Sequence, residues 1–404
     1  MTIDPLPPRF DHDAPDVLVD PYPAYRELRN AGPLCRFGPG QWGVTRHAEV
    51  SALLRDRRLG HGYPPEYRRF AVGDGPATEF FGAISIVRDP PEHAKLRGLM
   101  SKAFTPALVR GLSARLGELV DELLDPAADT GTLDVAKDLA YPLPITVICE
   151  LMGVPASDRN LVRPRAADLA RGWNTHVAEA DRPAVHDSVV WLREYVGAML
   201  DDRRRAAGDD LLSRMVAAAG DDGTGLTRDE IVDNAVFLFF AGFETTRNMI
   251  STGCAALLEH RDQLARLRAE PGLAPSAVEE FLRYDAPVQG AGRMVLEPIE
   301  VGGQVIRAGR VLVLLLGSAN HDERVYSEPD RLDIGRSPNP QLAFGSGSHF
   351  CLGAPLAREE GRVVFQRLLS RFAVIEPAGD PVRRFTSAGN IRAFESVPLS
   401  VRAA

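Results

Sequence analysis

The most informative segment of the chain is Phe344-Gly345-Ser346-Gly347-Ser348-His349-Phe350-Cys351-Leu352-Gly353. One cysteine lies in a loop with glycines on both sides, and a helix-forming run begins directly after it at Ala354. A sulfur at the start of a helix faces unpaired backbone N–H groups and the positive end of the helix dipole, and both favour thiolate over thiol. Glycines let the backbone approach a flat ligand closely. The segment therefore predicts a cysteinate that serves as the axial ligand of a haem iron.

This segment resembles the haem-binding signature of the cytochrome P-450 family, the haem-thiolate monooxygenases. The family pattern is Phe-Gly-x-Gly-x-His-x-Cys-x-Gly, and its fixed positions are filled here by Phe344, Gly345, Gly347, His349, Cys351 and Gly353. Such a pattern is far more specific than a lone Gly-x-Gly. The alternative is a buried or incidental cysteine in a Gly/Ser turn, since most free cysteines behave as small apolar residues.

Composition limits the class of protein. The 404 residues are 45% hydrophobic, which is ample for a sizeable core, and they contain no Gly-, Ser- or Pro-rich linker and no repeat. We therefore expect one domain over residues 1–404. The net charge of −8 argues against nucleic acid as a partner. Residues 1–17 are polar, so they predict neither a signal peptide nor a membrane anchor. No two of the four cysteines have zinc-ligand spacing. We expect a cytoplasmic monomer.

The hydrophobic pattern predicts mostly helix with small sheets. Helices are expected over residues 20–31, 47–55, 275–284 and from the cysteine loop to about 372. Residues 89–270 are almost wholly helical in pattern, with breaks near 126–131, 155 and 221–225. Residues 59–88 carry Gly, Pro and aromatic residues without a clear period, and they predict a long functional loop. Strands are expected over residues 41–45, 292–296, 299–305, 311–315, 373–376 and 396–401.

The longest expected helix begins at Thr227, because Thr227-Arg228-Asp229-Glu230 forms a capping box, and it runs to about His260. Its centre, residues 236–242, is apolar on all sides, so the helix is expected to pass through the middle of the molecule. The family resemblance implies the same architecture, a mainly α fold with small β-sheets and a long central helix over a haem.

The centre of this helix contains a candidate catalytic motif, Ala241-Gly242-Phe243-Glu244-Thr245-Thr246. A threonine hydroxyl tends to bond the carbonyl four residues earlier, here that of Ala241, which bends a helix. The motif resembles the family's oxygen-activation sequence. The resemblance implies that Ala241 lies against the haem, that Thr245 hydrogen-bonds dioxygen and that Glu244 supplies protons. The alternative is an ordinary helix with one buried acid, but an unpaired buried carboxylate is costly.

Glu280 and Arg283 lie three residues apart on one predicted helix face. Such pairs are common and weak as surface salt bridges. They match the family's Glu-x-x-Arg motif, whose third partner is an arginine in a later segment, and Arg331 fits that place. The resemblance implies a structural role for these three residues, namely to hold the core that supports the cysteine loop.

The two propionates of a haem need cationic or hydrogen-bonding partners. His93 and Arg97 lie at i and i+4 on a helix that begins with prolines, Arg293 lies in an expected strand, and His349 lies two residues before the cysteine. These four match family positions that bind propionates. Each of them alone could equally be a surface residue.

The distal pocket is predicted only in outline. By resemblance we assign to it residues of the central helix, of the early loop and of the segment before Arg293: Phe81, Ile86, Phe237, Phe240, Val288 and Gln289. Any one aromatic residue could instead be plain core. The two phenylalanines of the central helix favour a narrow, apolar site.

The resemblance implies a monooxygenase that uses thiolate-ligated haem b and O2 to hydroxylate or epoxidise an apolar small molecule, such as a macrolide, terpenoid or peptide. Electrons would come from NAD(P)H through a separate ferredoxin reductase and ferredoxin, because the chain carries no flavin or iron–sulfur motif. Two alternatives stay open. A haem peroxygenase fed by H2O2 would lack the Glu244–Thr245 pair, and a non-catalytic haem sensor would turn over no substrate.

Overall fold

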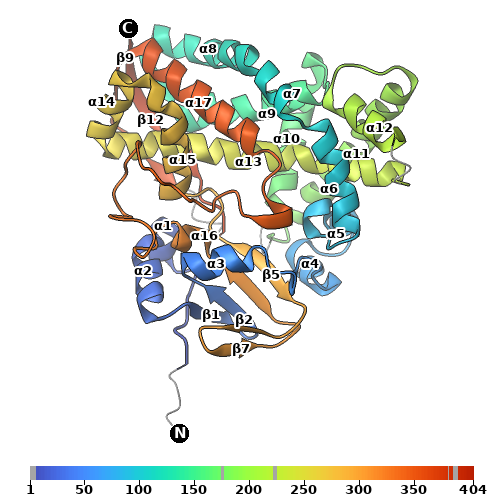
Figure 1. The fold of residues 1–404 in the computed structure, drawn as a ribbon. Coiled ribbons are helices and arrows are strands. Elements are labelled where there is room, and N and C mark those ends of the chain that lie inside the picture. Colours follow the sequence, from blue (N-terminus) through green and yellow to red (C-terminus); the bar gives the residue numbers. More distant parts are fainter. Residues whose placement is uncertain (1–5, 174–176, 222–224, 381, 385–389) are drawn as a thin grey trace.

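The computed structural model describes residues 6–173, 177–221, 225–380, 382–384 and 390–404. Helices form most of it, and the small sheets lie in two regions, one at the bottom and one at the upper left of the view (Figure 1). The α-helices are α1 (Pro15–Val19), α2 (Tyr22–Ala31), α3 (His47–Leu53), α4 (Pro65–Val72), α5 (Pro76–Ala83), α6 (Glu92–Ala103), α7 (Pro106–Gly111), α8 (Ser113–Thr130), α9 (Pro142–Leu151), α10 (Arg159–Arg171), α11 (Arg182–Arg205), α12 (Leu211–Asp221), α13 (Arg228–Glu259), α14 (Arg261–Ala269), α15 (Ala274–Tyr284), α16 (Leu316–Ala319) and α17 (Ala354–Arg371).

Short turns and strands complete the description. The helical turns are η1 (Ser85–Val87), η2 (Val135–Ala140), η3 (Ala156–Asp158), η4 (Pro271–Leu273) and η5 (Gly347–His349). The strands are β1 (Leu34–Gly38), β2 (Gln41–Val44), β3 (Leu59–Gly60), β4 (Thr132–Asp134), β5 (Ala291–Val295), β6 (Ile299–Val301), β7 (Gln304–Ile306), β8 (Val311–Leu314), β9 (Phe372–Pro377), β10 (Arg383–Arg384), β11 (Phe394–Ser396) and β12 (Pro398–Ala403). A mainly α fold with small sheets is therefore confirmed.

Helix α13 begins with the predicted capping box. The Thr227 hydroxyl accepts from the Glu230 amide at 3.2 Å, and the Glu230 carboxylate accepts from the Thr227 amide at 2.7 Å. The helix crosses the middle of the molecule, with α17 and α8 on one side of it and the sheet of β1, β2 and β5 on the other (Figure 1). Most of its side chains are buried, and the largest hydrophobic cluster surrounds it. The prediction of a central buried helix is confirmed.

The largest sheet has the strand order β1-β2-β8-β5-β3, in which β2 and β8 are parallel. A second hydrophobic cluster packs this sheet against α3 and α16. The predicted strand over residues 299–305 is instead a hairpin, β6–β7, because Gly302 and Gly303 both have positive φ angles and turn the chain. Strand β5 carries Arg293 opposite Leu312 of β8, so the sheet sets the position of this predicted site residue.

The prediction of a long loop over residues 59–88 is wrong. The structure has β3, α4, α5 and η1 there. Pro65 and Pro76 occupy the first positions of α4 and α5, where a missing amide costs nothing, and Gly73 and Gly75 separate the two helices with positive φ angles. The residues that suggested a loop therefore mark the ends of two short helices.

The side chain of Glu280 on α15 is fully buried and accepts hydrogen bonds from several donors. Arg283 of the same helix donates to both carboxylate oxygens at 2.8 Å. Arg336 donates at 3.1 and 3.2 Å, Asn339 at 3.1 Å and the Asp333 amide at 3.0 Å. Glu280 thereby ties α15 to the segment that leads into the cysteine loop.

The prediction that Arg331 is the third partner is wrong, because Arg336 has this place. The Arg331 side chain is 61% exposed and pairs with Glu328. Only its carbonyl takes part, as an acceptor from Arg283 and Arg336. Both arginines lie outside regular helix and strand, so no periodicity in the sequence indicates which of them turns inward.

We expect Arg336→Met to lower the free energy of unfolding by roughly 1.5–3 kcal/mol, because it removes charge-assisted hydrogen bonds from a buried carboxylate. Arg331→Met is the matched control and should change this free energy by less than about 0.5 kcal/mol, as an exposed substitution does. Chemical denaturation of the two variants measures both values. Equal destabilisation by the two substitutions would contradict the assignment.

Candidate active site

The cysteine loop is a tight structure that holds itself closed. The amide of Cys351 donates to the Phe344 carbonyl at 3.0 Å, and Gly345 and Gly347 have φ angles of 68° and 76°. A Cβ on Gly347 would lie 3.0 Å from the Leu54 carbonyl oxygen, so this glycine is required both for its conformation and for the close approach of α3. The loop therefore presents Cys351 at the start of α17 in one defined position.

Two opposing effects act on the Cys351 thiol. Burial raises its pKa, whereas the amides of Gly353 and Ala354 and the guanidinium of Arg97 lower it. Burial has the larger effect, so the net shift of the Cys351 pKa by the groups of the chain itself is upward. The dipole argument from the sequence therefore identified groups that stabilise the thiolate, but it did not give this net direction. Coordination of Cys351 to a metal cation would reverse this balance, because the cation would take the place of the thiol proton, which leaves to solvent, and would stabilise the thiolate.

An ion pair between α17 and α15 stabilises the cysteine loop. Arg358 of α17 donates to both carboxylate oxygens of Glu279 on α15, at 2.5 and 3.1 Å. The same guanidinium lies 4.6 Å from the ring centroid of Phe344, within the range of a cation–π contact. The aromatic residue of the signature is thus fixed by contacts from a neighbouring helix.

The candidate catalytic pair lies at the centre of α13. The Thr245 hydroxyl donates to the Ala241 carbonyl at 3.3 Å, as predicted, and Thr246 makes the same type of bond to Gly242 at 3.2 Å. Glu244 is paired with Arg247 of the next turn at 3.4 Å, and its side chain is 20% exposed. The acid is therefore neither isolated nor fully buried, so the cost of an unpaired buried carboxylate does not count against the ordinary-helix alternative.

The four predicted propionate partners lie in one region. His349 stacks on His93 with 3.8 Å between ring centroids. The charges of Arg97 and Arg293 both act on His349. Arg97 donates to the Phe350 carbonyl at 2.7 Å, next to the cysteine, and Arg293 donates to the Gly292 carbonyl at 2.8 Å. Chain segments from α6, β5 and the cysteine loop meet here.

Sequence reasoning missed a fifth member of this cluster, His61. Its ring stacks on His349 from the side opposite His93, with 3.7 Å between centroids. Burial, followed by the nearby positive charges, lowers the pKa of His61 to about 2 and that of His349 to about 3. No pattern around residue 61 indicates this role, because the stacking partner is almost 290 residues away in the chain.

The charged and polar groups of this cluster show whether its residues fit the two carboxylates of a haem. Asp89 is the carboxylate beside it, and its oxygens accept from the amides of His61 and Gly62. The His61 Nε2 atom is buried without a partner in the part of the chain that the structure describes. Imidazole and guanidinium groups thus lie together, while the oxygens of the neighbouring carboxylate already accept hydrogen bonds from backbone amides. The two carboxylates of a haem would supply the missing acceptors, so the residues fit this cofactor.

An aromatic cluster lies one to two turns before Thr245. Phe81 of α5 lies 6.2 Å from Phe240, and Phe237 lies 5.3 Å from Phe240, between ring centroids. Trp173, which the sequence did not indicate, lies 5.8 Å from Phe81 and 5.7 Å from Phe240. Four rings from three segments therefore gather beside α13, consistent with a narrow apolar site.

The other predicted pocket residues are placed differently. Ile86 packs partly buried against the large core, and Val288 pairs with Ile391 in an isolated β-bridge. For Gln289 the structure contradicts the prediction, because its amide donates to the Ala286 carbonyl at 2.8 Å and reaches the Tyr22 hydroxyl at 3.4 Å. This side chain faces α2 because a buried amide needs polar partners.

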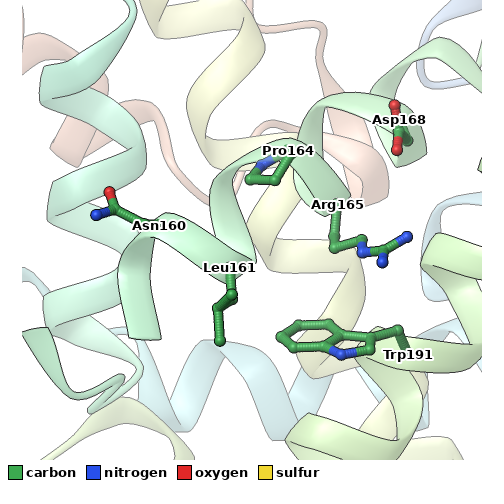
Figure 2. Close-up of a pocket in the computed structure, with 6 residues that line it drawn as sticks. All are labelled: Asn160, Leu161, Pro164, Arg165, Asp168 and Trp191. Atoms are coloured by element: carbon green, nitrogen blue, oxygen red, sulfur yellow. The ribbon is translucent and has the colours of Figure 1, made fainter. Parts of the chain in front are cut away.

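A groove of about 280 Å³ lies on the outer surface between α10 and α11 (Figure 2). Figure 2 shows the Arg165 side chain beside the Trp191 ring, with Asp168 on the same side of the view and Asn160 on the opposite side. Asp168 already accepts from Ser188 at 2.9 Å. Because no predicted site residue lines this groove, the chemistry is to be sought at the cysteine loop and α13.

Comparison with known proteins decides the family. The family model for cytochrome P450 matches residues 161–392. The chain belongs to the cytochrome P450 family. It is 39% identical over 378 residues to the cytochrome P450 monooxygenase PikC of Streptomyces venezuelae, a match that covers 90% of this chain and 87% of PikC. It is 36% identical to the 6-deoxyerythronolide B hydroxylase of Saccharopolyspora erythraea, over 90% of this chain and 92% of that protein.

The fold is shared as well. The crystal structure of CalO2 has a TM-score of 0.91 at 36% identity, and the superposition covers 98% of this chain and 99% of CalO2. Membership of the P450 family implies haem with a thiolate ligand and monooxygenase chemistry. Among the described residues, no helix is both long enough and apolar enough to cross a membrane.

We expect Arg97→Ala to speed haem loss by about tenfold or more, because it removes a charge-assisted hydrogen bond to the cysteine loop and a cation from the cluster. Transfer of haem to an excess of apomyoglobin measures this rate. Arg110→Ala, an exposed arginine on α7, is the control and should leave the rate unchanged. A rate equal to that of the wild type in Arg97→Ala would contradict the role of this arginine.

Proposed function

We propose that this P450 uses O2 and thiolate-ligated haem b to insert one oxygen atom into an apolar secondary metabolite. The observation that carries the proposal is the acid–alcohol pair Glu244–Thr245 at the centre of α13, in a chain whose cysteine loop matches the haem-binding signature. When bound, the haem supplies the reductive cleavage of the O–O bond, which a thiolate ligand promotes. The residues of the chain supply the binding, the orientation and the protons.

Thr245 is suited to hold and pass a proton. At 3.3 Å its bond to the Ala241 carbonyl is long for an O–H donor, so the hydroxyl can turn toward a ligand at small cost. The hydroxyl also offers lone pairs that accept from water. Thr246 makes a back-bond of similar length, but it lies on another face of α13 and is buried, so we do not assign it this role.

Glu244 is placed to renew that proton. Its carboxylate is partly exposed and is held at 3.4–3.5 Å by Arg247, which is longer than a strong charge-assisted bond. A group held this loosely can exchange between its arginine and water. We therefore assign Glu244 to the transfer of protons from solvent to Thr245.

We infer the substrate class from the aromatic side chains that gather beside α13. Phe81, Trp173, Phe237 and Phe240 present ring surfaces and no charge beside α13. Aromatic side chains of this kind favour an apolar substrate and exclude water from the reacting groups. The relatives that are named for a monooxygenase and for a 6-deoxyerythronolide B hydroxylase support oxidation of a secondary metabolite such as a macrolide.

We expect product formation to require NADPH, ferredoxin reductase, ferredoxin and O2 together, and to be far slower with H2O2 alone. Product analysis by mass spectrometry with each component omitted in turn measures this dependence. Efficient turnover on H2O2 without ferredoxin would favour the peroxygenase alternative. Absence of product under both conditions, across a panel of apolar substrates that shift the haem spectrum, would favour the sensor.

Thr245→Ala tests the proton path. We expect haem and substrate to bind as before, NADPH consumption to continue, and the product formed per NADPH to fall, with hydrogen peroxide accounting for the difference. Thr245→Ser keeps the hydroxyl and should restore most of the coupling, and Glu244→Gln should lower it. Thr246→Ala is the matched control on the same helix. Equal coupling in the wild type, Thr245→Ala and Glu244→Gln would show that protons take another path.

A further inference from the structure

The segment between β3 and α4 brings a histidine to the cofactor region that matches no motif in the sequence. His61 is 9% exposed, and its ring lies nearly parallel to that of His349, with an interplanar angle of 18°. His349 in turn stacks on His93 at 25°. Three imidazoles from distant parts of the chain therefore form one column, with His349 in the middle.

This position is fixed by the backbone. The Asp89 carboxylate accepts from the amide of His61 at 2.8 Å and from that of Gly62 at 3.0 Å. A Cβ on Gly60 would lie 2.6 Å from the same carboxylate, so the chain passes close to it. Asp89 thus holds the segment in place, because its oxygens accept hydrogen bonds from backbone amides. Its carboxylate is therefore not a partner of the His61 imidazole in the part of the chain that the structure describes.

The imidazole has one free polar atom. The backbone of Ile86 engages the ring on one side, while Nε2 is buried without a hydrogen-bond partner in the described part of the chain. A buried polar atom without a partner costs roughly 1–3 kcal/mol, so such an atom marks the place of a ligand or an ordered water. The charged groups that act on His61 are Arg293, His349 and His93, and all of them are basic.

We propose that His61 is a further partner of the carboxylate edge of the haem, beside His93, Arg97, Arg293 and His349. The proposal rests on the proposed function only in that haem is bound, and it does not depend on turnover. The negative charge of a haem carboxylate would favour the imidazolium form of His61, in which both ring nitrogens donate, so that Nε2 could donate to the carboxylate while the other nitrogen stays on the Ile86 backbone. His61 is then a cofactor-binding residue that sequence patterns do not reveal.

Two substitutions separate a polar role from a packing role. His61→Phe keeps a flat ring that can stack on His349 but removes the polar atom. His61→Gln keeps a hydrogen-bond donor of similar reach but removes the ring. His12→Phe, at a histidine outside the column, is the control. Each holoprotein is mixed with an excess of apomyoglobin, and the rate of haem transfer is followed by absorbance.

We expect haem loss to be about tenfold faster in His61→Phe than in the wild type, close to the wild type in His61→Gln, and unchanged in His12→Phe. The reduced carbon monoxide complex of His61→Phe should keep its thiolate-type Soret band, since Cys351 is untouched. Proteins loaded with haem dimethyl ester, in which the carboxylates are blocked, should lose it at rates that agree within about twofold between wild type and His61→Phe.

Equal haem-loss rates in the wild type and His61→Phe would overturn the proposal. Equal acceleration for haem and for its dimethyl ester would overturn it too, because the residue would then act by packing. If His61→Phe does not fold, the comparison of His61→Gln with His61→Ala for both cofactors gives the same decision. A holoprotein that retains haem through His61 but oxidises no substrate would contradict the proposed function and leave this inference intact.

Discussion

The buried carboxylate of Glu280 is the interaction on which the rest of the site depends. A charge removed from water is tolerated only where enough donors surround it, and this one accepts from two guanidiniums, an amide side chain and a backbone amide. Three of these donors, Arg336, Asn339 and the Asp333 amide, lie in the segment that leads into the cysteine loop. The requirement to satisfy one charge therefore fixes the approach of that segment to α15. The neighbouring Glu279 makes a parallel link to Arg358 of α17, so both ends of the loop are tied to the same helix.

The distribution of charge around the loop follows from this arrangement. On α15, the acids are matched by Arg283 of the same helix and by arginines from later segments. Beside the histidine column, the described acid Asp89 holds the backbone, and the charged groups that act on His61 are basic. Basic side chains buried together are costly unless a ligand supplies negative charge. The same molecule thus contains one charge cluster that is complete by itself and one that is suited to an anionic cofactor.

Helix α13 carries both the candidate proton-transfer pair and two residues of the aromatic cluster. Its capping box fixes the first turn, and the largest hydrophobic cluster surrounds the helix in the core. In the proposed function, the aromatic rings one and two turns earlier contact the substrate and the Glu244–Thr245 pair transfers protons. Both tasks would then fall on neighbouring turns of one helix, which would set the distance between them.

The local patterns were readable without the structure because each depends on short-range geometry. The cysteine loop, the Glu244–Thr245 pair and the capping box of α13 are each contained within about ten residues, and the last of these was found in the predicted form. The pairing of Glu280 with Arg283 is likewise a property of one helix turn. The family assignment rests on such segments and agrees with the comparisons.

Contacts between distant segments were not readable in this way. Arg336 rather than Arg331 meets Glu280 because the path of an irregular segment, not a period, decides which side chain turns inward. Gln289 faces Tyr22, and Trp173 meets Phe81 and Phe240, because tertiary packing brought a polar or an aromatic partner within reach. His61 reaches His349 through the folding of residues 59–88 into short helices. Sequence patterns gave the identity of the chemistry, and the packed fold chose the residues that surround it, since burial and hydrogen bonding are settled only when the segments meet.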